Sequence, residues 1–308
     1  MTKKTAKAKP RSARRPVEPG RSSKRARQAA TQRRRRRTRA VAFSAIAGVV
    51  AIVAVMTIVA LTSTPEATRG SGDAGRAAEL AQNVPVSVLN SVGAGSDIKR
   101  PSPLPSDTPP LERDGKVEVL YVGAEYCPYC AAERWPLVVA LGRFGTFADL
   151  GATESGAEDV FPRTPTFTFH GSSFTSDTLA FVAVETNTNE PDPAGGYTAL
   201  EQPTPREQSL LRRYDRQPYT AQPGAIPFLM IGNRYVSIGA SYDPSVLQGM
   251  TRLEIGQALS DPASPVAQAV GGAANVLTAA ICRATDGTPP SVCSDPAIAM
   301  IVETLPQP

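Results

Sequence analysis

The sequence is poor in two side chains that often hold metal ions, with one histidine and four cysteines among 308 residues. Cys127 and Cys130 form a Cys-X-X-Cys pair, which could supply half of a zinc site. The other two cysteines, Cys282 and Cys293, have ten residues between them, and this is not the spacing of a second zinc knuckle. His170 is far in sequence from both pairs. A zinc site is therefore the weaker interpretation, and we expect neither a metal nor an organic cofactor.

One stretch of the chain lacks charge altogether. Residues 40–61 have no charged side chain, and Ser44 and Thr57 are their only polar residues. A helix of this length spans about 33 Å, which is enough to cross the ~30 Å hydrocarbon core of a bilayer. The run is longer than the core of a typical signal peptide, and no small-x-small cleavage pattern follows closely. We therefore expect an uncleaved transmembrane signal anchor at residues 40–61.

Acidic residues are nearly absent before this span. Residues 1–39 hold 17 Lys and Arg against one acid, Glu18, whereas the rest of the chain has a net charge of −11. The composition of residues 1–39 predicts a disordered tail. The positive-inside rule predicts that this tail is cytoplasmic and that the chain after Leu61 is exported. A nucleic-acid partner for the tail is the weaker interpretation, because aromatic residues are few and anionic lipid lies beside it. All four cysteines then lie outside the cytoplasm, where disulfides persist. The expected location is the cell membrane, crossed once.

The exported part divides into a linker and a domain. Residues 62–83, rich in Thr, Ser and Gly, are predicted to be a flexible linker, and residues 84–306 an α/β domain. Residues 84–92 are expected to form a short helix. Residues 100–110 contain five prolines and should be irregular. Residues 143–150 are expected to be a loop that two phenylalanines attach to the core.

The domain is organised around the Cys-X-X-Cys. Residues 117–122 are apolar and β-branched, which indicates a buried strand, and residues 131–141 read as an apolar helix. A helix N-terminus presents unpaired N–H groups and a partial positive charge, which stabilise a thiolate. Cys127 would then be a nucleophile, and Cys130 could attack the mixed disulfide that it forms. An inert structural disulfide is the alternative interpretation.

Further patterns predict the remaining elements. A tight hairpin turn is expected at Gly232-Asn233. Cys282 and Cys293 lie near the ends of two predicted helices, and a bridge between them would be a structural clamp. His170 is expected at the surface end of a strand. The expected elements are strands at 166–170 and 179–185, a polar helix at 205–215, and helices that begin after Asp243, Ser264 and Asp295 and run to about 259, 284 and 303.

The order of strand, Cys-X-X-Cys, helix and proline-led hairpin resembles the thioredoxin fold. The Ala-Glu-Tyr-Cys at 124–127 is similar to the Ala-Glu-Trp-Cys of thioredoxin, and Cys-Pro-Tyr-Cys is the type seen in glutaredoxins. In that fold a cis-proline faces the dithiol and docks the substrate backbone, so the resemblance assigns this role to Ile226-Pro227. The expected class is a thioredoxin-like α/β fold with helical additions.

The chain resembles the domain of unknown function 929 family more closely still. The matching residues are CPYCAAERWPLVVALGRFGTF at 127–147, TPTFTF at 164–169, PFLMIGNRYVSIGAS at 227–241, and the paired Cys282 and Cys293. This resemblance implies the architecture, because the family has no assigned reaction.

Two features depart from thioredoxin. Thioredoxin keeps a buried acid six residues before its first cysteine, and Tyr121 occupies that position here. The nearby carboxylates of Glu125 and Glu133 are expected to be solvated side chains. Residues 171–201 are unlike thioredoxin and are expected to be an insertion that shapes the cleft.

These observations predict a membrane-anchored, extracytoplasmic thiol-disulfide oxidoreductase, an oxidase or isomerase of exported proteins. Cys127 would be the nucleophile and Cys130 the resolving thiol, while Pro128 and Tyr129 would tune the redox potential and Pro227 would dock substrate. The expected partners are exported cysteine-containing proteins, the lipid bilayer, and a membrane redox partner such as a quinone-linked oxidase. The alternative is a non-catalytic thioredoxin-like module for binding or envelope assembly, with a structural disulfide.

Overall fold

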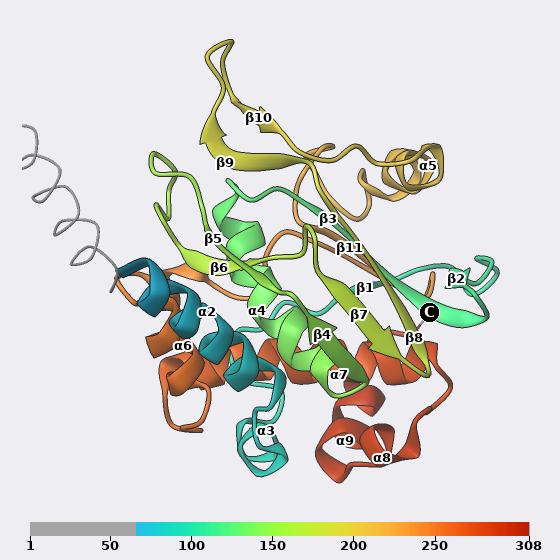
Figure 1. The fold of residues 1–308 in the computed structure, drawn as a ribbon. Helices are drawn as coiled ribbons and strands as arrows, with labels where there is room; N and C mark the ends of the chain where they lie inside the picture. The colour runs from blue at the N-terminus through green and yellow to red at the C-terminus, as the bar shows by residue number, and fades with distance from the viewer. Residues whose placement is uncertain (1–65, 308) are drawn as a thin grey trace, which may run out of the picture. The chain divides into compact units, whose positions relative to one another are not determined.

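The apolar run before the dithiol forms strand β3, Lys116–Gly123, inside a six-stranded mixed sheet. This sheet belongs to a computed structural model that describes residues 66–307. Strand β3 pairs antiparallel with β11 (Phe228–Ile231) and parallel with β8 (Leu179–Glu185) (Figure 1). The sheet is completed by β12 (Tyr235–Ile238), β1 (Ser102–Pro103) and β2 (Glu112–Arg113). The described chain is therefore of the mixed α/β class.

The sheet is buried on both faces, which explains why its strands read as continuous apolar runs. Successive side chains of a strand point to opposite faces. Val119 and Tyr121 of β3 lie in the core cluster that contains helix α4 (Pro128–Gly142), whereas Leu120 and Val122 lie in a second cluster. Residues of α5 (Pro205–Tyr214) pack against that second cluster. The dithiol helix therefore covers one face of the sheet, and α5 the other.

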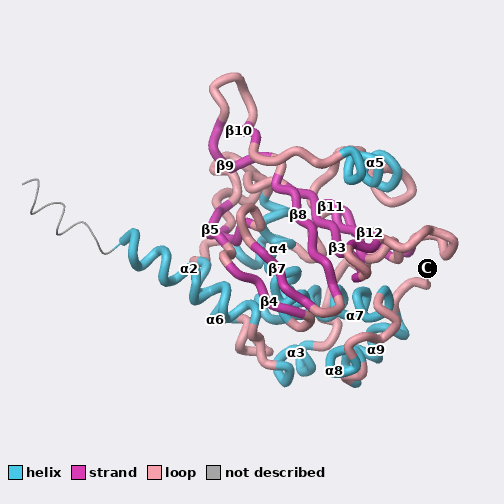
Figure 2. The backbone as a smooth tube through the Cα atoms, turned by 45° about the vertical axis from the view of Figure 1, so that its right-hand side comes forward, coloured by secondary structure: helices cyan, strands magenta, loops and turns pink. Residues whose placement is uncertain are grey.

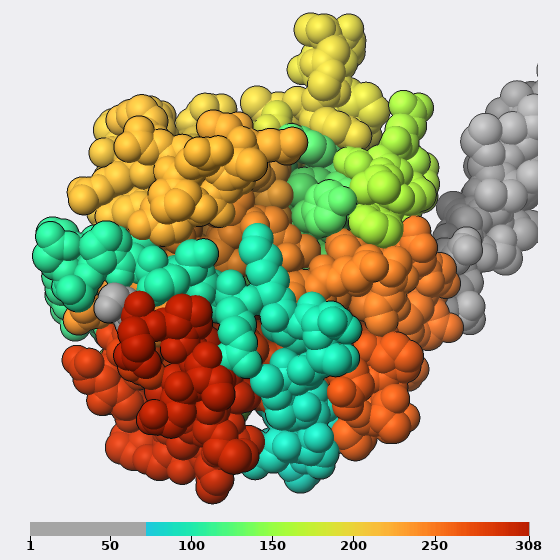
Figure 3. All heavy atoms as spheres, turned by 180° about the vertical axis from the view of Figure 1, so that it is seen from behind, coloured from blue at the N-terminus to red at the C-terminus, as the bar shows by residue number. Residues whose placement is uncertain are grey.

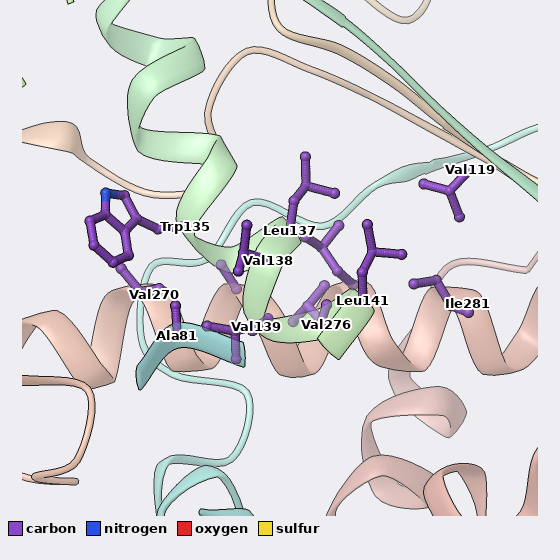
Figure 4. Packing of buried hydrophobic residues seen from close by; sticks show 14 of the residues in the cluster. Ala81, Val119, Trp135, Leu137, Val138, Val139, Leu141, Val270, Val276 and Ile281 are labelled. Atoms are coloured by element: carbon purple, nitrogen blue, oxygen red, sulfur yellow. The ribbon is translucent and has the colours of Figure 1, made fainter. Parts of the chain in front are cut away.

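Helix α4 is buried on nearly all sides, as 13 of its 15 residues are inaccessible to solvent. Its apolar side chains Trp135, Val138 and Leu141 pack over helix α7 (Gly272–Ala284), which contributes Val276 (Figure 4). A fully buried side chain of this size contributes roughly 1.5–3 kcal/mol relative to an exposed one. The helix that carries the dithiol is therefore a rigid core element.

The prediction of a flexible linker at 62–83 is wrong for the residues of this range that the structure describes from Glu66 to Gln82, because they form helix α2. Ala74, Ala77, Ala78 and Ala81 recur at helical spacing and are buried. Helix α2 passes close to its neighbours: a Cβ added to Gly142 would lie 2.8 Å from Gln82 O, and one added to Gly256 would lie 3.2 Å from Ala77 Cα. The folded body therefore begins before residue 84. The predicted short helix is confirmed as α3 (Val86–Val92).

Three small antiparallel sheets flank the dithiol helix and the central sheet. Part of the predicted loop at 143–150 is strand β4, although Phe144 and Phe147 are buried as expected. Residues 171–201 are not wholly an insertion, because they supply β8 to the central sheet, but their β9–β10 hairpin does project from the domain (Figure 2). The pairs are β4 (Gly145–Ala148) with β7 (Ser173–Ser176), β5 (Gly151–Glu154) with β6 (Pro165–Thr168), and β9 (Asn187–Pro191) with β10 (Tyr197–Ala199).

The C-terminal part is helical, as predicted, with one interruption. The helix expected from Asp243 to about 259 is two helices, because Gly249 adopts φ +73° between them. The segment before β2 lies beside the last helices (Figure 3), where Asn90 donates to Asp295 and Arg100 to Thr304. The helical elements are a 3₁₀ helix (Pro244–Leu247), α6 (Arg252–Ala258), a π-helical turn (Ala267–Gly271), α7, α8 (Pro290–Cys293) and α9 (Pro296–Thr304).

The predicted basic tail (1–39) and signal anchor (40–61) lie outside the described residues. Across residues 66–307, none of the helices combines the length and the apolar content needed to cross a membrane.

Candidate functional site

The dithiol lies where β3 gives way to α4. Cys127 is the N-cap residue of α4, with φ −74° and ψ 121°, and its Sγ accepts a hydrogen bond from the Cys130 N–H at 3.3 Å. The sulfur thereby caps the N-terminus of α4, as a serine or aspartate side-chain oxygen caps other helices. Pro128 follows at the first helical position, where its fixed φ suits the helix and its missing N–H leaves no bond unmade.

The two thiols differ in their access to solvent. Both cysteines are unbridged, with Cys127 5% exposed and Cys130 fully buried. Tyr129 between them is 41% exposed. Of the two cysteines, only Cys127 therefore retains any exposure to solvent.

The segment that the resemblance placed opposite the dithiol does lie there. The Ile226 carbonyl oxygen is 3.8 Å from Cys127 Sγ, and the Ile226–Pro227 peptide bond is cis. Ile226 also packs in the small apolar cluster formed by Ala124 and the two cysteines. The Cys-X-X-Cys motif therefore identified one side of this site and the resemblance to the thioredoxin fold the other, and the two come from chain segments about 100 residues apart.

The environment separates the acidities of the two thiols. A hydrogen bond with the Cys130 side chain lowers the pKa of Cys127, helped by the backbone of Cys130 and Tyr129 and by the charge of Arg134, and opposed by burial. Burial raises the pKa of Cys130 well above its ordinary value, and its interaction with Cys127 raises it further. Cys127 is therefore the sulfur that ionises first.

A buried ion pair lies beneath the dithiol. Arg134 donates from Nη2 to Glu185 Oε2 at 2.6 Å and from Nε to Glu185 Oε1 at 2.8 Å, and both side chains are fully buried. Arg134 Nη2 also donates to Ala124 O at 2.8 Å. The guanidinium carbon is 5.8 Å from the centre of the Tyr121 ring. Sequence reasoning missed this pair, although an arginine inside an apolar helix and a glutamate ending an apolar strand were visible signals.

Tyr121 occupies the position that departs from thioredoxin, and it faces this pair. Its side chain is fully buried, and its hydroxyl has no hydrogen-bond partner. Burial raises the pKa of the Tyr121 hydroxyl well above its ordinary value. The residue is therefore neutral, and it supplies no carboxylate to the dithiol.

The expectation that Glu133 is solvated is wrong. Its side chain is 1% exposed and accepts hydrogen bonds from the backbone N–H and the hydroxyl of Ser241, each at 2.8 Å. Burial raises the pKa of Glu133 to about 7, although the bonds from Ser241 act in the other direction. The sequence around Glu133 does not show that this side chain is buried and bonded, because its partner Ser241 is 108 residues away. Glu125 is half-buried.

A surface groove with a volume of about 610 Å³ adjoins the dithiol. Tyr129 and Ile226 both line it. Tyr129 is two residues after Cys127 in the sequence, and Ile226 O is 3.8 Å from the Cys127 sulfur. Phe161 packs edge-on against Tyr129, with ring centres 5.8 Å apart. The remaining lining residues are Gln222, Ala225, Gly239, Ala240, Tyr242, Asp243 and Pro244. The aromatic side chains of Tyr129 and Phe161 thus line the groove beside the dithiol.

Tyr126, the residue before Cys127, is held by the β9–β10 hairpin. The Tyr126 and Tyr197 rings stack with an interplanar angle of 2° and centres 4.2 Å apart. Tyr126 O also accepts a hydrogen bond from Gly156 N–H at 2.7 Å. Part of the segment that was expected to be an insertion thus contributes to the site.

The other predicted residues lie apart from this constellation. Cys282 and Cys293 are bridged, as the sequence predicted, and join α7 to α8. His170 is exposed, and its Nδ1 lies 2.7 Å from Glu201 Oε1. Within residues 66–307, His, Cys, Asp and Glu side chains form no group of three or more that could hold a metal ion.

No curated protein and no solved structure matches the chain. A family model described as Domain of unknown function (DUF929) matches residues 106–283. That range contains β3, the dithiol with all of α4, and the Ile226–Pro227 segment opposite it. Because the match spans more than half of the sequence, the chain belongs to the DUF929 family.

Proposed function

We propose that this protein is a thiol-disulfide oxidoreductase with a thioredoxin-like fold, in which Cys127 is the nucleophile and Cys130 the resolving thiol. The observation that carries the proposal is the asymmetry of the pair. Cys127 Sγ accepts a hydrogen bond from a backbone N–H at the start of α4, and Cys127 retains slight exposure to solvent. Cys130 is fully buried. An asymmetric dithiol at a helix N-terminus suits exchange chemistry, because one sulfur meets the partner and the other releases it.

We propose the oxidase direction. A substrate thiolate attacks Cys127 Sγ of the oxidised pair, a mixed disulfide forms, and the electron pair of the broken S–S bond goes to Cys130. A second substrate thiolate then attacks the substrate sulfur of the mixed disulfide and releases Cys127 as a thiolate. The substrate loses two electrons and gains a disulfide, and the protein gains a dithiol. A membrane redox partner, such as a quinone-linked oxidase, accepts those electrons in turn.

The proposed substrates are exported proteins that present cysteines in extended segments. Ile226 O, which precedes the cis bond to Pro227, lies 3.8 Å from Cys127 Sγ, and Tyr129 is an exposed aromatic residue two positions after Cys127. A chain in extended conformation can bind such a site through its own backbone groups. We further propose that residues 40–61 anchor the protein in the membrane and place this site outside the cytoplasm.

The second candidate is a non-catalytic binding module with a structural Cys127–Cys130 bridge. One observation favours it, since Cys127 is only 5% exposed. The proline segment opposite Cys127 favours the oxidoreductase, because a merely structural bridge needs no docking backbone beside it.

Trapping of substrates distinguishes the two. A Cys130→Ala variant of the full chain lacks the thiol that returns a mixed disulfide to the Cys127–Cys130 bridge. With an oxidant and reduced exported proteins that carry a single cysteine, and therefore no second thiolate, it should accumulate disulfide-linked adducts through Cys127. The matched control, Cys127→Ala with Cys130→Ala, should form none. If the single variant traps no more than the control, the oxidoreductase proposal is wrong and the module takes its place.

A further inference from the structure

We propose that Arg134, held in place by Glu185, is the positioning residue that stabilises negative charge on the dithiol, above all on Cys130 when it becomes the leaving group. This inference rests on the proposed function, since it assigns a role within the same exchange reaction. It adds a cation to a site whose sequence motif contains none.

Arg134 and Cys130 lie on the same face of α4, because Arg134 follows Cys130 by four residues. Arg134 also donates to Ala124 O, at the start of the turn that leads from β3 into the dithiol. Its side chain is fully buried, so bulk water does not screen its charge.

The Arg134 guanidinium keeps one nitrogen without a hydrogen bond. Nε and Nη2 are both used by Glu185 and Ala124, and Nη1 is buried with no hydrogen-bond partner. A buried donor without a partner is costly and calls for a reason. A thiolate on Cys130, one helical turn away, would give that donor a negative partner in the reactive state.

Arg134 is the cation that acts on both thiols. Its charge lowers the pKa of Cys127 and acts in the same direction on Cys130. Tyr121 and Tyr126 also interact with the thiols, but burial raises the pKa of each hydroxyl, so both are neutral. Glu185 fixes the Arg134 side chain through Nε and Nη2.

The step that this charge assists is balanced without any further reactant. A substrate thiolate attacks Cys127 Sγ, the new S–S bond forms, and the Cys127–Cys130 bond breaks. The electron pair of that bond remains on Cys130 Sγ, which leaves as a thiolate. Because Cys130 is fully buried, water cannot stabilise the charge that arrives there. The guanidinium, already oriented by its ion pair, supplies that stabilisation.

The test is a pair of variants of the full chain that should act in opposite directions. Arg134→Gln removes the cation, so the equilibrium of the dithiol with a glutathione thiol–disulfide buffer should move toward the bridged form by roughly tenfold or more, the equivalent of one pKa unit. Glu185→Gln leaves the cation uncompensated and should move the same equilibrium toward the dithiol. The rate at which the glutathione thiolate opens the bridge should fall in the first variant and rise in the second.

A structural role for the pair predicts something else, since either variant would loosen the same packing and both would shift the equilibrium in one direction. That outcome, or no shift in either variant, overturns the proposal. If Arg134→Gln does not fold, Arg134→Lys, which keeps the charge, replaces it. The equilibrium of Arg134→Lys should stay close to that of the wild type, whereas that of Glu185→Gln should still shift toward the dithiol. Equal shifts in these two variants overturn the proposal.

The matched control is Arg206→Gln, which removes a 2.7 Å ion pair to Glu118 on the other face of the sheet. Glu118 is as deeply buried as Glu185, but the control should leave the glutathione equilibrium unchanged. This measurement uses no protein substrate. Failure to trap exported proteins would therefore count against the proposed function, whereas absence of opposite shifts would count against the role of Arg134.

Discussion

Glu133 of the dithiol helix accepts two hydrogen bonds from Ser241, one from the backbone N–H and one from the hydroxyl, each at 2.8 Å. These bonds join α4 to the segment after β12, whose residues Gly239, Ala240 and Tyr242 line the groove beside the dithiol. The carboxyl group is thus a structural connection between the helix that carries the thiols and the groove beside them.

The stability of the protein should depend on the proton of Glu133. Burial raises its pKa from 4.5 to about 7, so the folded state keeps a proton that the unfolded chain loses. Stability from this group is complete below the unfolded value and is lost as the pH rises to about 7, a change on the order of 3 kcal/mol. Glu133→Gln should remove that change. Urea unfolding of both proteins at pH 5 and pH 8 measures it, and parallel pH profiles would contradict the assignment.

Alkylation should distinguish the two thiols of the site. After mild reduction at neutral pH, Cys127 should react first, because its pKa is lowered and its sulfur is the one partly reachable. Cys130 should react only when the protein is unfolded, since burial both covers it and raises its pKa. Mass mapping after brief treatment with iodoacetamide measures this. Equal labelling of both sulfurs in the folded protein would be the contrary result.

The Cys282–Cys293 bridge should contribute stability and no chemistry. Its closed loop is about a dozen residues, for which the loop-entropy model gives roughly 3 kcal/mol. Replacing both residues with alanine should lower the free energy of unfolding by about that amount and leave the reactivity of Cys127 unchanged. Chemical denaturation and the alkylation rate measure the two effects, and a changed rate would connect this bridge to the site.

Helix α2 should be required for the stability of the domain. Ala77 is fully buried, so Ala77→Asp places an unpaired charge in the core and should lower the free energy of unfolding by roughly 3 kcal/mol. Asp73→Ala is the matched control, because Asp73 is exposed on the same helix and the change should be within about 0.5 kcal/mol. If both variants unfold alike, residues 66–82 behave as a linker after all.

Local patterns predicted much of the fold because their physics is local. The hairpin at Gly232-Asn233 was predictable, and both residues adopt the positive φ that such a turn needs. The Pro-capped α9 and the apolar β8 were equally visible. Helix α2 was not, because its buried face is made of alanine, and the glycine and threonine around that face suggested a linker.

The site was predictable only where it is contiguous or where a resemblance supplied the second segment. Cys127 and Cys130 follow from one motif, and Pro227 followed from the thioredoxin-like pattern. The Arg134–Glu185 pair depends on the parallel pairing of β3 with β8, which places Glu185 level with Gly123. No local rule specifies that register. The sequence therefore shows two charged residues in apolar elements, but it does not show that Arg134 and Glu185 form a pair.

The spacing of the four cysteines also bears on oxidative folding. Four cysteines can pair in three ways, and in this chain each sulfur is nearest in sequence to its native neighbour. Either mispaired arrangement needs bridges over roughly 150 residues, which cost about 2 kcal/mol more in chain entropy than the Cys282–Cys293 loop. An unfolded chain exposed to an oxidant is therefore biased toward the Cys282–Cys293 bridge, and away from bridges between this pair and Cys127 or Cys130, before any tertiary structure exists.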